Sequence, residues 1–420
     1  MARLTAMSTF LVLVLSLFTI AWQQDRVIAR ATALPQPIRA SAEHVLIETT
    51  GSAAAPVITE TNLKDLVAAG GRALPSRVMG RVAEVRSETP GTGIRHQWPG
   101  IYAEAAFGGD ALAVAFDDPI NRYRITVDDG AGPVVLITRP ERRAFLISGL
   151  GPGRHEVRLD KVSQSSEPGS FLGFHVPRGG LSAPPPRPLG RQIEFVGDSD
   201  SVGYGNMAPH RDCTDEEIFQ WTDTARSFAP QIARHFGADY QIMAASGIGL
   251  VRNYGPPDPG HTMMSLYPRV VFGEPSPWSG AAWRPDLLVL ALGSNDFALP
   301  LGLGEQWPDE TALRQDFEAH YRAFIRHLRV RNPDAFILLV ALRDYGATYL
   351  AAQEAIVQTL REAGDLRVAL LALPEMERTA CDWHPSLKDH RSAAAQIIRF
   401  VEGRPDIWRQ DRGDAVNPSP

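Results

Sequence analysis

The sequence predicts two folded domains: an all-β sandwich, then an α/β domain whose parallel sheet is covered by helices on both faces. Residues 77–180 contain short runs of alternating apolar and polar residues between turns rich in Gly, Asp and Pro, which is typical of a sandwich. From residue 191 onward, continuous apolar strands alternate with helical segments, which is typical of a parallel sheet buried on both faces. The chain has 420 residues, 44% of them hydrophobic, which is enough for two cored domains.

The first 33 residues have the three-part layout of a secretory signal peptide. Arg3 precedes an apolar stretch over residues 10–22, which is shorter than the ~20 residues that a membrane span needs. Small residues at an A-x-A-like spacing follow: Ala29, Ala31 and Ala33. Residues 1–33 are therefore predicted to direct export, as a cleaved signal or as an uncleaved N-terminal anchor. In both cases the folded part would be secreted or periplasmic, with no other membrane contact.

Residues 34–76 mix Ala-rich and Pro-containing pieces with one possible strand at 44–47, and we expect a linker with one docked strand or helix. Within the sandwich of residues 77–180, Asp129-Gly130 is a hairpin-turn signal, because Gly tolerates a positive φ. The expected strands of the sandwich are 101–107, 112–116, 122–127, 134–137 and 155–159.

A Pro-rich segment at 181–190 separates the two domains. Its three adjacent prolines favour an extended polyproline II conformation and cannot continue a helix. The α/β domain is expected to cover 191–405, followed by a tail at 406–420. Its expected strands are 193–196, 240–244, 287–292, 336–340 and 368–371, and its expected helices are 225–236, 311–329, 349–362 and 392–401.

Candidate catalytic residues directly follow three of the expected strands. Ser199 ends a Gly-Asp-Ser turn after the run Ile193–Val196, Gly247 follows the second strand, and Asn295 follows the third. In parallel sheets the ligand site lies beyond the carboxyl ends of the strands, so these residues are expected to meet. Ser199 is the candidate nucleophile, ahead of Ser201, because it lies directly on the strand-end turn.

His384 is the candidate general base, with Asp382 two residues before it. A carboxylate that accepts the Nδ1 hydrogen fixes the tautomer in which Nε2 is available to the serine. His390 ranks lower, because it falls in what looks like the start of the last helix.

Three groups are candidates for an oxyanion hole: the backbone N–H groups of Ser199 and Gly247, and the side-chain amide of Asn295. Such donors stabilise the negative charge that develops on the carbonyl oxygen during acyl transfer. Asp198 is expected to hold the turn, and Asp296 to cap the segment that follows it.

The chain has two cysteines, Cys213 and Cys381. Cys213 follows Ser199 by 14 residues and Cys381 directly precedes Asp382, so the sulfurs are close if nucleophile and base share one site. Export permits a disulfide. We expect a Cys213–Cys381 bridge, with two unrelated thiols as the alternative.

The remaining composition argues against several functions. The net charge is −6 and no stretch is densely basic, which argues against nucleic-acid binding. The sequence has no H-E-x-x-H motif, no cysteine pair at zinc-ligand spacing, no phosphate loop and no dinucleotide fingerprint. We therefore expect no metal and no organic cofactor, and the sequence does not indicate an oligomeric state.

Four motifs in this order resemble the SGNH (GDSL) hydrolase superfamily: Gly197-Asp198-Ser199, Gly247, Gly293-x-Asn295-Asp296 and Asp382-x-His384. Together with the β-rich region, the segments Arg191–Ser199 and Gly203–Asn206 look like carbohydrate esterase family 2, over roughly residues 77–403. The resemblance implies a jelly-roll sandwich followed by a three-layer, flavodoxin-like SGNH domain. It also implies removal of O-acetyl groups from plant polysaccharides such as xylan and glucomannan.

Two positions depart from the family pattern. Asp200 stands where the family commonly has Ile; we expect it to point to solvent, although an inward carboxylate would raise the pKa of His384. The spacing is Asp-x-His where most SGNH enzymes have Asp-x-x-His, and some family members orient the histidine through a backbone carbonyl. Whether Asp382 or a carbonyl orients His384 stays open.

The sequence therefore predicts an exported serine esterase that removes O-acetyl groups from polysaccharide or oligosaccharide through an acyl-serine intermediate. The alternatives are a lipase or thioesterase of the same superfamily, and a carbohydrate-binding protein with a vestigial hydrolase. Tyr204 and Trp383 are expected to contact the substrate. Trp278 and Trp283 are further candidates for a sugar cleft, although tryptophans in apolar loops are more often packing residues.

Overall fold

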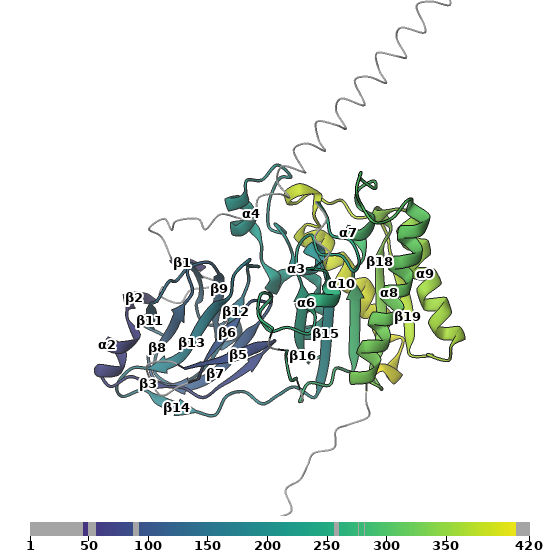
Figure 1. The fold of residues 1–420 in the computed structure, drawn as a ribbon. Coiled ribbons are helices and arrows are strands. Elements are labelled where there is room, and N and C mark those ends of the chain that lie inside the picture. Colours follow the sequence, from purple (N-terminus) through teal and green to yellow (C-terminus); the bar gives the residue numbers. More distant parts are fainter. Residues whose placement is uncertain are drawn as a thin grey trace, which may run out of the picture.

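The computed structural model describes residues 45–48, 56–86, 92–255, 260–275, 277–280 and 282–408. The predicted export signal and residues 409–420 of the expected tail lie outside this part of the chain. None of the helices in the described part combines the length and apolar character that a membrane span requires. Figure 1 shows a β-rich half beside a half in which helices cover a sheet.

The β-rich half is a sandwich of two seven-stranded sheets with antiparallel pairing throughout. One sheet has the order β1 (Val45–Glu48), β10 (Val134–Thr138), β9 (Arg122–Val127), β12 (Arg154–Lys161), β7 (Tyr102–Gly108) and β14 (Leu181–Ala183), with β4 (Ser76–Met79) also on β7. The other has the order β2 (Val57–Thr61), β11 (Ala144–Ser148), β8 (Ala111–Asp117), β13 (Gly169–Val176), β6 (Thr92–His96) and β5 (Val82–Arg86), with β3 (Arg72–Ala73) on β13. Between the sheets, Phe116 packs against Tyr123, Phe145 and Phe171, with ring centroids 4.6–6.1 Å apart.

The structure differs from the sequence prediction at both ends of the sandwich. Residues 34–76, expected to be a linker with one docked element, contribute an edge strand to each sheet, β1 and β2, together with helix α2 (Leu63–Ala68). The partners of these strands, β10 and β11, lie far along the chain, so no local pattern indicates the pairing. At the other end, residues 181–183 of the expected Pro-rich linker pair with β7 as strand β14.

The second half is a five-stranded sheet in which every neighbouring pair is parallel. Its order is β16 (Ala238–Ala244), β15 (Arg191–Gly197), β17 (Leu287–Ala291), β18 (Phe336–Leu342) and β19 (Val368–Leu373). All five strands overlap those that the sequence predicts. When the strands are numbered by their order in the chain, they lie across the sheet in the order 2-1-3-4-5, which is flavodoxin-like.

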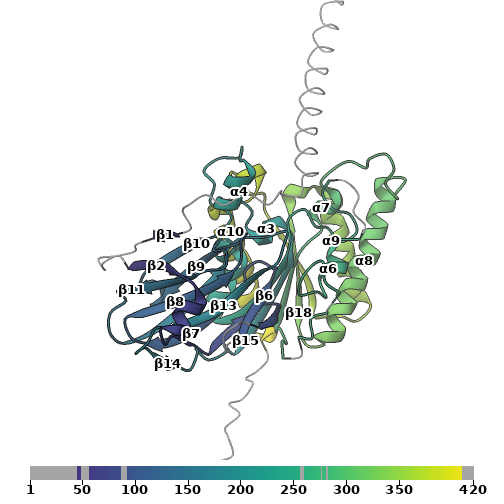
Figure 2. The ribbon, with the colours of Figure 1, turned by 60° about the vertical axis from the view of Figure 1, so that its left-hand side comes forward.

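Helices cover both faces of this sheet, because successive side chains of a strand point to opposite faces. On one face, α8 (Glu310–Arg331) and α9 (Ala347–Glu362) pack against Leu288 and Leu290 of β17. On the other, α5 (Phe228–His235) and α10 (Leu387–Glu402) pack against Leu287 and Val289. Figure 2 shows α8 and α9 together on one side of the sheet.

Helix α10 begins earlier, and the core continues further, than the sequence predicts. Ser386 and Asp389 form a capping box, in which each side chain accepts a hydrogen bond from the other residue's backbone N–H (3.3 and 2.9 Å). This cap starts the helix at Leu387. Ile407, assigned to the tail, is buried in the same core as α10.

A carboxylate in β16 joins the two halves. Asp239 is 1% exposed and accepts hydrogen bonds from the Arg77 guanidinium (2.5 Å) and the Tyr102 hydroxyl (2.8 Å) of the sandwich. Its second oxygen accepts from the backbone N–H of Leu189 (2.9 Å), at the end of the Pro-rich segment. These donors compensate the burial of the charge, so Asp239 fixes the sandwich and the linker against the sheet.

We expect Asp239→Ala to destabilise the protein by about 3–5 kcal/mol, because the Arg77 charge and the Tyr102 hydroxyl lose a buried acceptor. The free energy of unfolding in urea measures this. Asp117→Ala is the matched control: Asp117 pairs with Arg142 at the surface (3.1 Å), where such a pair contributes about 1 kcal/mol or less. Equal losses in the two variants would contradict a bridging role for Asp239.

Candidate active site

The register of the parallel sheet ends three strands at one level. Gly197 of β15 lies opposite Ala244 of β16 and Ala291 of β17, so the segments after these strands emerge at the same edge. Figure 1 shows α3 (Ser199–Val202) and α7 (Ser294–Phe297) at this edge. Those segments carry the candidates predicted from the sequence: Ser199, Gly247 and Asn295.

Ser199 is the first residue of helix α3, directly after the strand-end turn. Asp198 caps α3 by accepting a hydrogen bond from the N–H of Asp200 (3.1 Å). A Cβ at Gly197 would lie 2.0 Å from the Ser201 hydroxyl, so this tight turn requires glycine. Ser199 is 7% exposed whereas Ser201 is fully buried, which favours Ser199 as the nucleophile.

Asp198 connects two of the loops at this edge. Its carboxylate accepts a hydrogen bond from the hydroxyl of Ser294, at the start of α7. Burial, with the neighbouring Asp200 charge, raises the pKa of Asp198 to about 7. Asp198 therefore has a structural role in the turn, in agreement with the sequence prediction.

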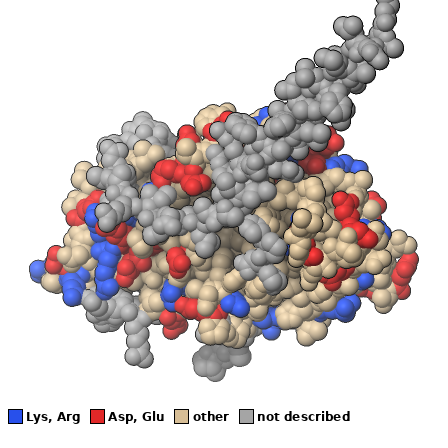
Figure 3. Space-filling view, turned by 45° about the horizontal axis from the view of Figure 1, so that its top comes forward, with Lys and Arg blue, Asp and Glu red and all other residues tan. Residues whose placement is uncertain are grey.

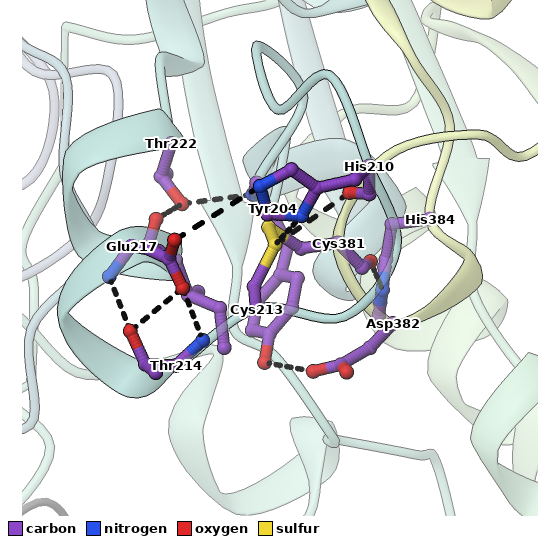
Figure 4. The surroundings of a disulfide bond; sticks show 11 residues. Tyr204, His210, Cys213, Thr214, Glu217, Thr222, Cys381, Asp382 and His384 are labelled. Carbon is purple, nitrogen blue, oxygen red and sulfur yellow. Dashed lines mark hydrogen bonds and ion pairs between the residues drawn. A yellow bond between two sulfur atoms is a disulfide. The ribbon is translucent and has the colours of Figure 1, made fainter.

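The imidazole of His384 is oriented by a backbone carbonyl. His384 follows the 3₁₀ turn Cys381–Trp383, and its Nδ1 lies 3.0 Å from the carbonyl oxygen of Cys381 (Figure 4). Because a carbonyl oxygen can only accept, Nδ1 carries the ring hydrogen and Nε2 has the lone pair that a general base needs. Burial lowers the pKa of His384 below its ordinary value, against the attraction of Asp200, and so favours the neutral ring.

Tyr204 connects the nucleophile to the base. Its backbone N–H donates to the Ser199 carbonyl (3.1 Å), and its ring centroid lies 4.3 Å from that of His384. Its hydroxyl donates to the Asp382 carboxylate (3.1 Å). Tyr204 thus contacts both Ser199 and His384, although within the described residues no hydrogen bond joins the side chains of these two.

Asp382 does not occupy the place of a triad acid. The sequence leaves open whether Asp382 or a backbone carbonyl accepts the Nδ1 hydrogen of His384, and in the structure the Cys381 carbonyl does so. Asp382 and Trp383 have positive φ (49° and 62°), and the His384 N–H donates to the Cys381 carbonyl (3.0 Å), so this tight turn brings that carbonyl rather than the Asp382 side chain to the imidazole. The Asp382 carboxylate instead faces the Tyr204 hydroxyl (Figure 4).

The two other candidates for the oxyanion hole lie on loops joined by a hydrogen bond. The Asn295 amide donates to the carbonyl of Ile248 (2.9 Å), and it carries a second N–H because an amide has two. Gly247, directly before Ile248, has φ +77°, a conformation that favours glycine. Asn295 and Gly247 are therefore neighbours at the edge where Ser199 lies.

Asp296 holds the Gly247 loop in place. Its carboxylate accepts hydrogen bonds from the backbone N–H groups of Leu250, Val251 and Arg252 (2.8–3.1 Å). Burial raises the pKa of Asp296 to about 6, against the effect of these donors. The sequence predicts that Asp296 caps the segment after it. In the structure, the Asp296 carboxylate instead holds a loop that lies 44–46 residues earlier in the chain.

Asp200 is buried, so the expectation that it points to solvent is wrong. Its carboxylate accepts hydrogen bonds from the Arg378 guanidinium (2.9 Å) and the Tyr345 hydroxyl (2.8 Å). Burial alone would raise the pKa of Asp200, but the charges of Arg378 and His384, with the hydrogen bonds from Arg378 and Tyr345, together hold that pKa below its usual value. The partners lie 145 and 178 residues away in the chain, so no local pattern indicates them.

His390, the lower-ranked candidate base, has a packing role. It is buried on α10, where Nδ1 accepts the backbone N–H of Phe228 (3.3 Å). Burial lowers its pKa to about 4, and its lone pair is already used.

Two of the four aromatic candidates for a sugar cleft are packing residues. Trp283 donates its indole N–H to buried Glu194 (2.8 Å), and Trp278 lies under the Arg81 guanidinium. Trp383, by contrast, is 56% exposed directly before His384, and the Arg211 guanidinium covers one face of its ring.

Charges at the surface are mixed. On the visible part of the face shown in Figure 3, acidic and basic side chains are interspersed. Among the described residues, no group of three or more His, Cys, Asp or Glu side chains is placed to hold a metal ion. The absence of a cofactor and of a nucleic-acid partner stays a prediction.

Comparison with known proteins identifies the family. Residues 78–186 match the carbohydrate esterase 2 N-terminal domain, and residues 193–397 match the GDSL-like lipase/acylhydrolase domain. An acetylxylan esterase / glucomannan deacetylase of Cellvibrio japonicus is 37% identical over 337 residues, covering 80% of this chain and 92% of that protein. The chain belongs to carbohydrate esterase family 2.

Solved structures agree with this assignment. The esterase resembles a carbohydrate esterase whose active site is described as displaying divergent catalytic and non-catalytic binding functions (TM-score 0.75, 34% identity, 80% of this chain and 100% of that chain). It also resembles a family two carbohydrate esterase from Clostridium thermocellum in complex with cellohexaose (TM-score 0.68, 26% identity, 80% and 100%). The predicted sandwich and SGNH domain are confirmed, and the chain is a carboxylic ester hydrolase.

The predicted disulfide is present in this esterase. Cys213 and Cys381 are bonded, with their Cα atoms 5.4 Å apart. The bond ties the loop after the nucleophile to the residue whose carbonyl orients His384 (Figure 4). Gly205 passes so close that a Cβ there would lie 2.4 Å from the Cys381 Cβ. The base loop is thus held by the disulfide on one side and by Tyr204 on the other.

Two contributors to the esterase site were missed by the sequence analysis. Gln164 of the sandwich accepts the backbone N–H of Ser246 (3.1 Å), directly before Gly247. Arg378 donates to the Trp383 carbonyl (3.3 Å) as well as to the carboxylate beside the nucleophile. Both lie outside any motif, and their importance depends on contacts between distant segments.

We expect Asp382→Ala to retain ester hydrolysis within about tenfold of the wild type, because a carbonyl orients His384. His384→Ala removes the base itself and is expected to lower kcat by roughly 10²–10⁴-fold. Hydrolysis of p-nitrophenyl acetate at neutral pH measures both. Tyr204→Phe is the matched control, because it loses the contact with Asp382 but keeps the ring on His384. A loss in Asp382→Ala as large as in His384→Ala would contradict the carbonyl's role.

Proposed function

We propose that this esterase removes O-acetyl groups from acetylated polysaccharide or oligosaccharide, with Ser199 as nucleophile and His384 as base. The observation that carries the mechanism is the tautomer of His384, whose Nδ1 faces a carbonyl so that Nε2 is the basic nitrogen. The substrate class is supported by the relative that is an acetylxylan esterase / glucomannan deacetylase.

In the first half of the proposed reaction, the Ser199 hydroxyl attacks the acetyl carbonyl carbon while Nε2 of His384 accepts the hydroxyl proton. The N–H groups of Ser199 and Gly247 and the amide of Asn295 donate to the oxygen that becomes negative. The bond from the carbonyl carbon to the sugar oxygen then breaks. His384 gives its proton to that oxygen, and Ser199 keeps the acetyl group.

In the second half, water attacks the acetyl group on Ser199 while His384 again accepts a proton. The same donors stabilise the second tetrahedral intermediate. The bond to the serine oxygen breaks, His384 returns the proton to Ser199, and acetate leaves. Tyr204 and Trp383 lie beside His384 and are the proposed sugar contacts.

We also propose that the esterase acts outside the cytoplasm, in a secreted or periplasmic form. The support is the predicted export signal at residues 1–33 together with the Cys213–Cys381 bond, because disulfides persist in oxidising compartments.

We expect Ser199→Ala to lower acetate release from acetylated xylan by roughly 10³-fold or more, because the acyl-serine intermediate cannot form. Acetate is measured enzymatically, with acetylated glucomannan in parallel. Ser201→Ala is the matched control on the same turn and is expected to keep most of the activity, since its side chain is enclosed. Undiminished release by Ser199→Ala would remove Ser199 from the mechanism.

We expect kcat/KM to fall as the pH is lowered from about 8, with a midpoint below about pH 6.5. Only neutral His384 accepts the serine proton, and burial moves the pKa of His384 below its usual value, about 6.5. The inactive protonated form therefore accumulates only in more acidic solution. Acetate release measured at limiting substrate concentration across this pH range tests the direction of the change in kcat/KM. A midpoint above pH 7 would contradict the prediction.

A further inference from the structure

Arg378, in the loop after β19, connects three parts of the active-site edge. Its guanidinium donates to Asp200 (2.9 Å), beside the nucleophile, and to Asp344 (2.6 Å), after β18. It also donates to the backbone carbonyl of Trp383 (3.3 Å), the residue before His384. The nucleophile turn and the base loop are therefore attached to the same cation.

The ring of His384 has a neutral partner, because Nδ1 donates to the Cys381 carbonyl. Of the charges that act on this ring, the Asp200 charge is the strongest, and it favours the protonated imidazole. The charged and titratable groups facing His384 come from several elements: Asp200 on α3, Tyr204 after α3, Arg378 after β19, Asp382 on its own turn and His390 on α10.

Asp200 is the more readily ionised member of a pair of buried carboxylates. Burial disfavours its ionisation, but the charges of Arg378 and His384 and the hydrogen bonds from Arg378 and Tyr345 together offset this, so the pKa of Asp200 lies below its usual value. Burial and the Asp200 charge raise the pKa of Asp198 to about 7. Asp200 therefore ionises at a lower pH than Asp198 does.

We propose that Asp200 is a positioning residue for ester hydrolysis: it places a fixed negative charge beside the imidazolium of His384, and it holds the base loop through Arg378. This inference rests on the proposed roles of Ser199 and His384. When His384 takes the serine proton, a positive charge forms in a buried site, where a preorganised anion stabilises it. The task of a triad acid would thus fall to the residue after the nucleophile.

Asp200→Asn tests the proposal, because the amide keeps the shape and can still accept the Tyr345 hydroxyl while the charge is lost. The ring C–H signals of His384 are followed by NMR across pH in histidine-labelled protein, and they are assigned by their absence in His384→Ala. We expect the pKa of His384 to fall by about one unit. We also expect kcat on an acetyl ester to fall by about tenfold, with KM unchanged.

Asp344→Asn is the matched control. It removes the other carboxylate on Arg378, which is not among the strongest charges acting on His384. A purely structural network predicts that both variants lower Tm alike and that neither moves the pKa of His384. The proposal predicts that only Asp200→Asn lowers this pKa.

If Asp200→Asn does not fold, the double variant Asp200→Leu with Arg378→Met replaces it in the test. Apolar side chains of similar size often replace a buried ion pair with little loss of stability. Asp200 acts on His384 more strongly than Arg378 does, so the pKa of His384 is expected to fall here too, by less. An unchanged or raised pKa in the folded variants would overturn the proposal. Failure of the proposed function is read separately, from Ser199→Ala in the same acetyl ester assay.

Discussion

The position of β15 between β16 and β17 is the constraint on which the site depends. Three parallel strands that end at one level deliver three loops to one edge, but the hydrogen bonds of the sheet stop where the loops begin. The loops are therefore held by side chains: Asp198 accepts the Ser294 hydroxyl, and Asp296 accepts three N–H groups of the loop after β16. The sheet supplies proximity, and the carboxylates supply the fixed geometry that acyl transfer requires.

Burial and proton transfer make opposite demands on this edge. A partly buried imidazole resists a positive charge, yet a general base must carry one for part of each cycle. The Cys381 carbonyl fixes the orientation of the His384 ring without adding a charge. The compensating negative charge comes from adjacent buried carboxylates, of which Asp200, paired with Arg378, ionises more readily than Asp198.

Features that depend on local sequence could be predicted. Apolar runs indicated the five parallel strands, and the placement of the two cysteines beside the expected nucleophile and base indicated their pairing. Features that depend on distant partners could not. Asp200 was expected in solvent because nothing nearby pairs with it, and its partner Arg378 lies 178 residues away. Spacing alone left open whether Asp382 or a backbone carbonyl orients His384, and the geometry of the turn decides it.

The bond between Cys213 and Cys381 closes a span of 168 residues that contains four of the five parallel strands. In the chain-entropy model, a cross-link over such a span removes about 5 kcal/mol of conformational freedom from the unfolded state. The same bond anchors the carbonyl on which the tautomer of the base depends. One covalent link therefore acts on the denatured ensemble and on the reacting group together, so any change that weakens it during evolution affects both at once.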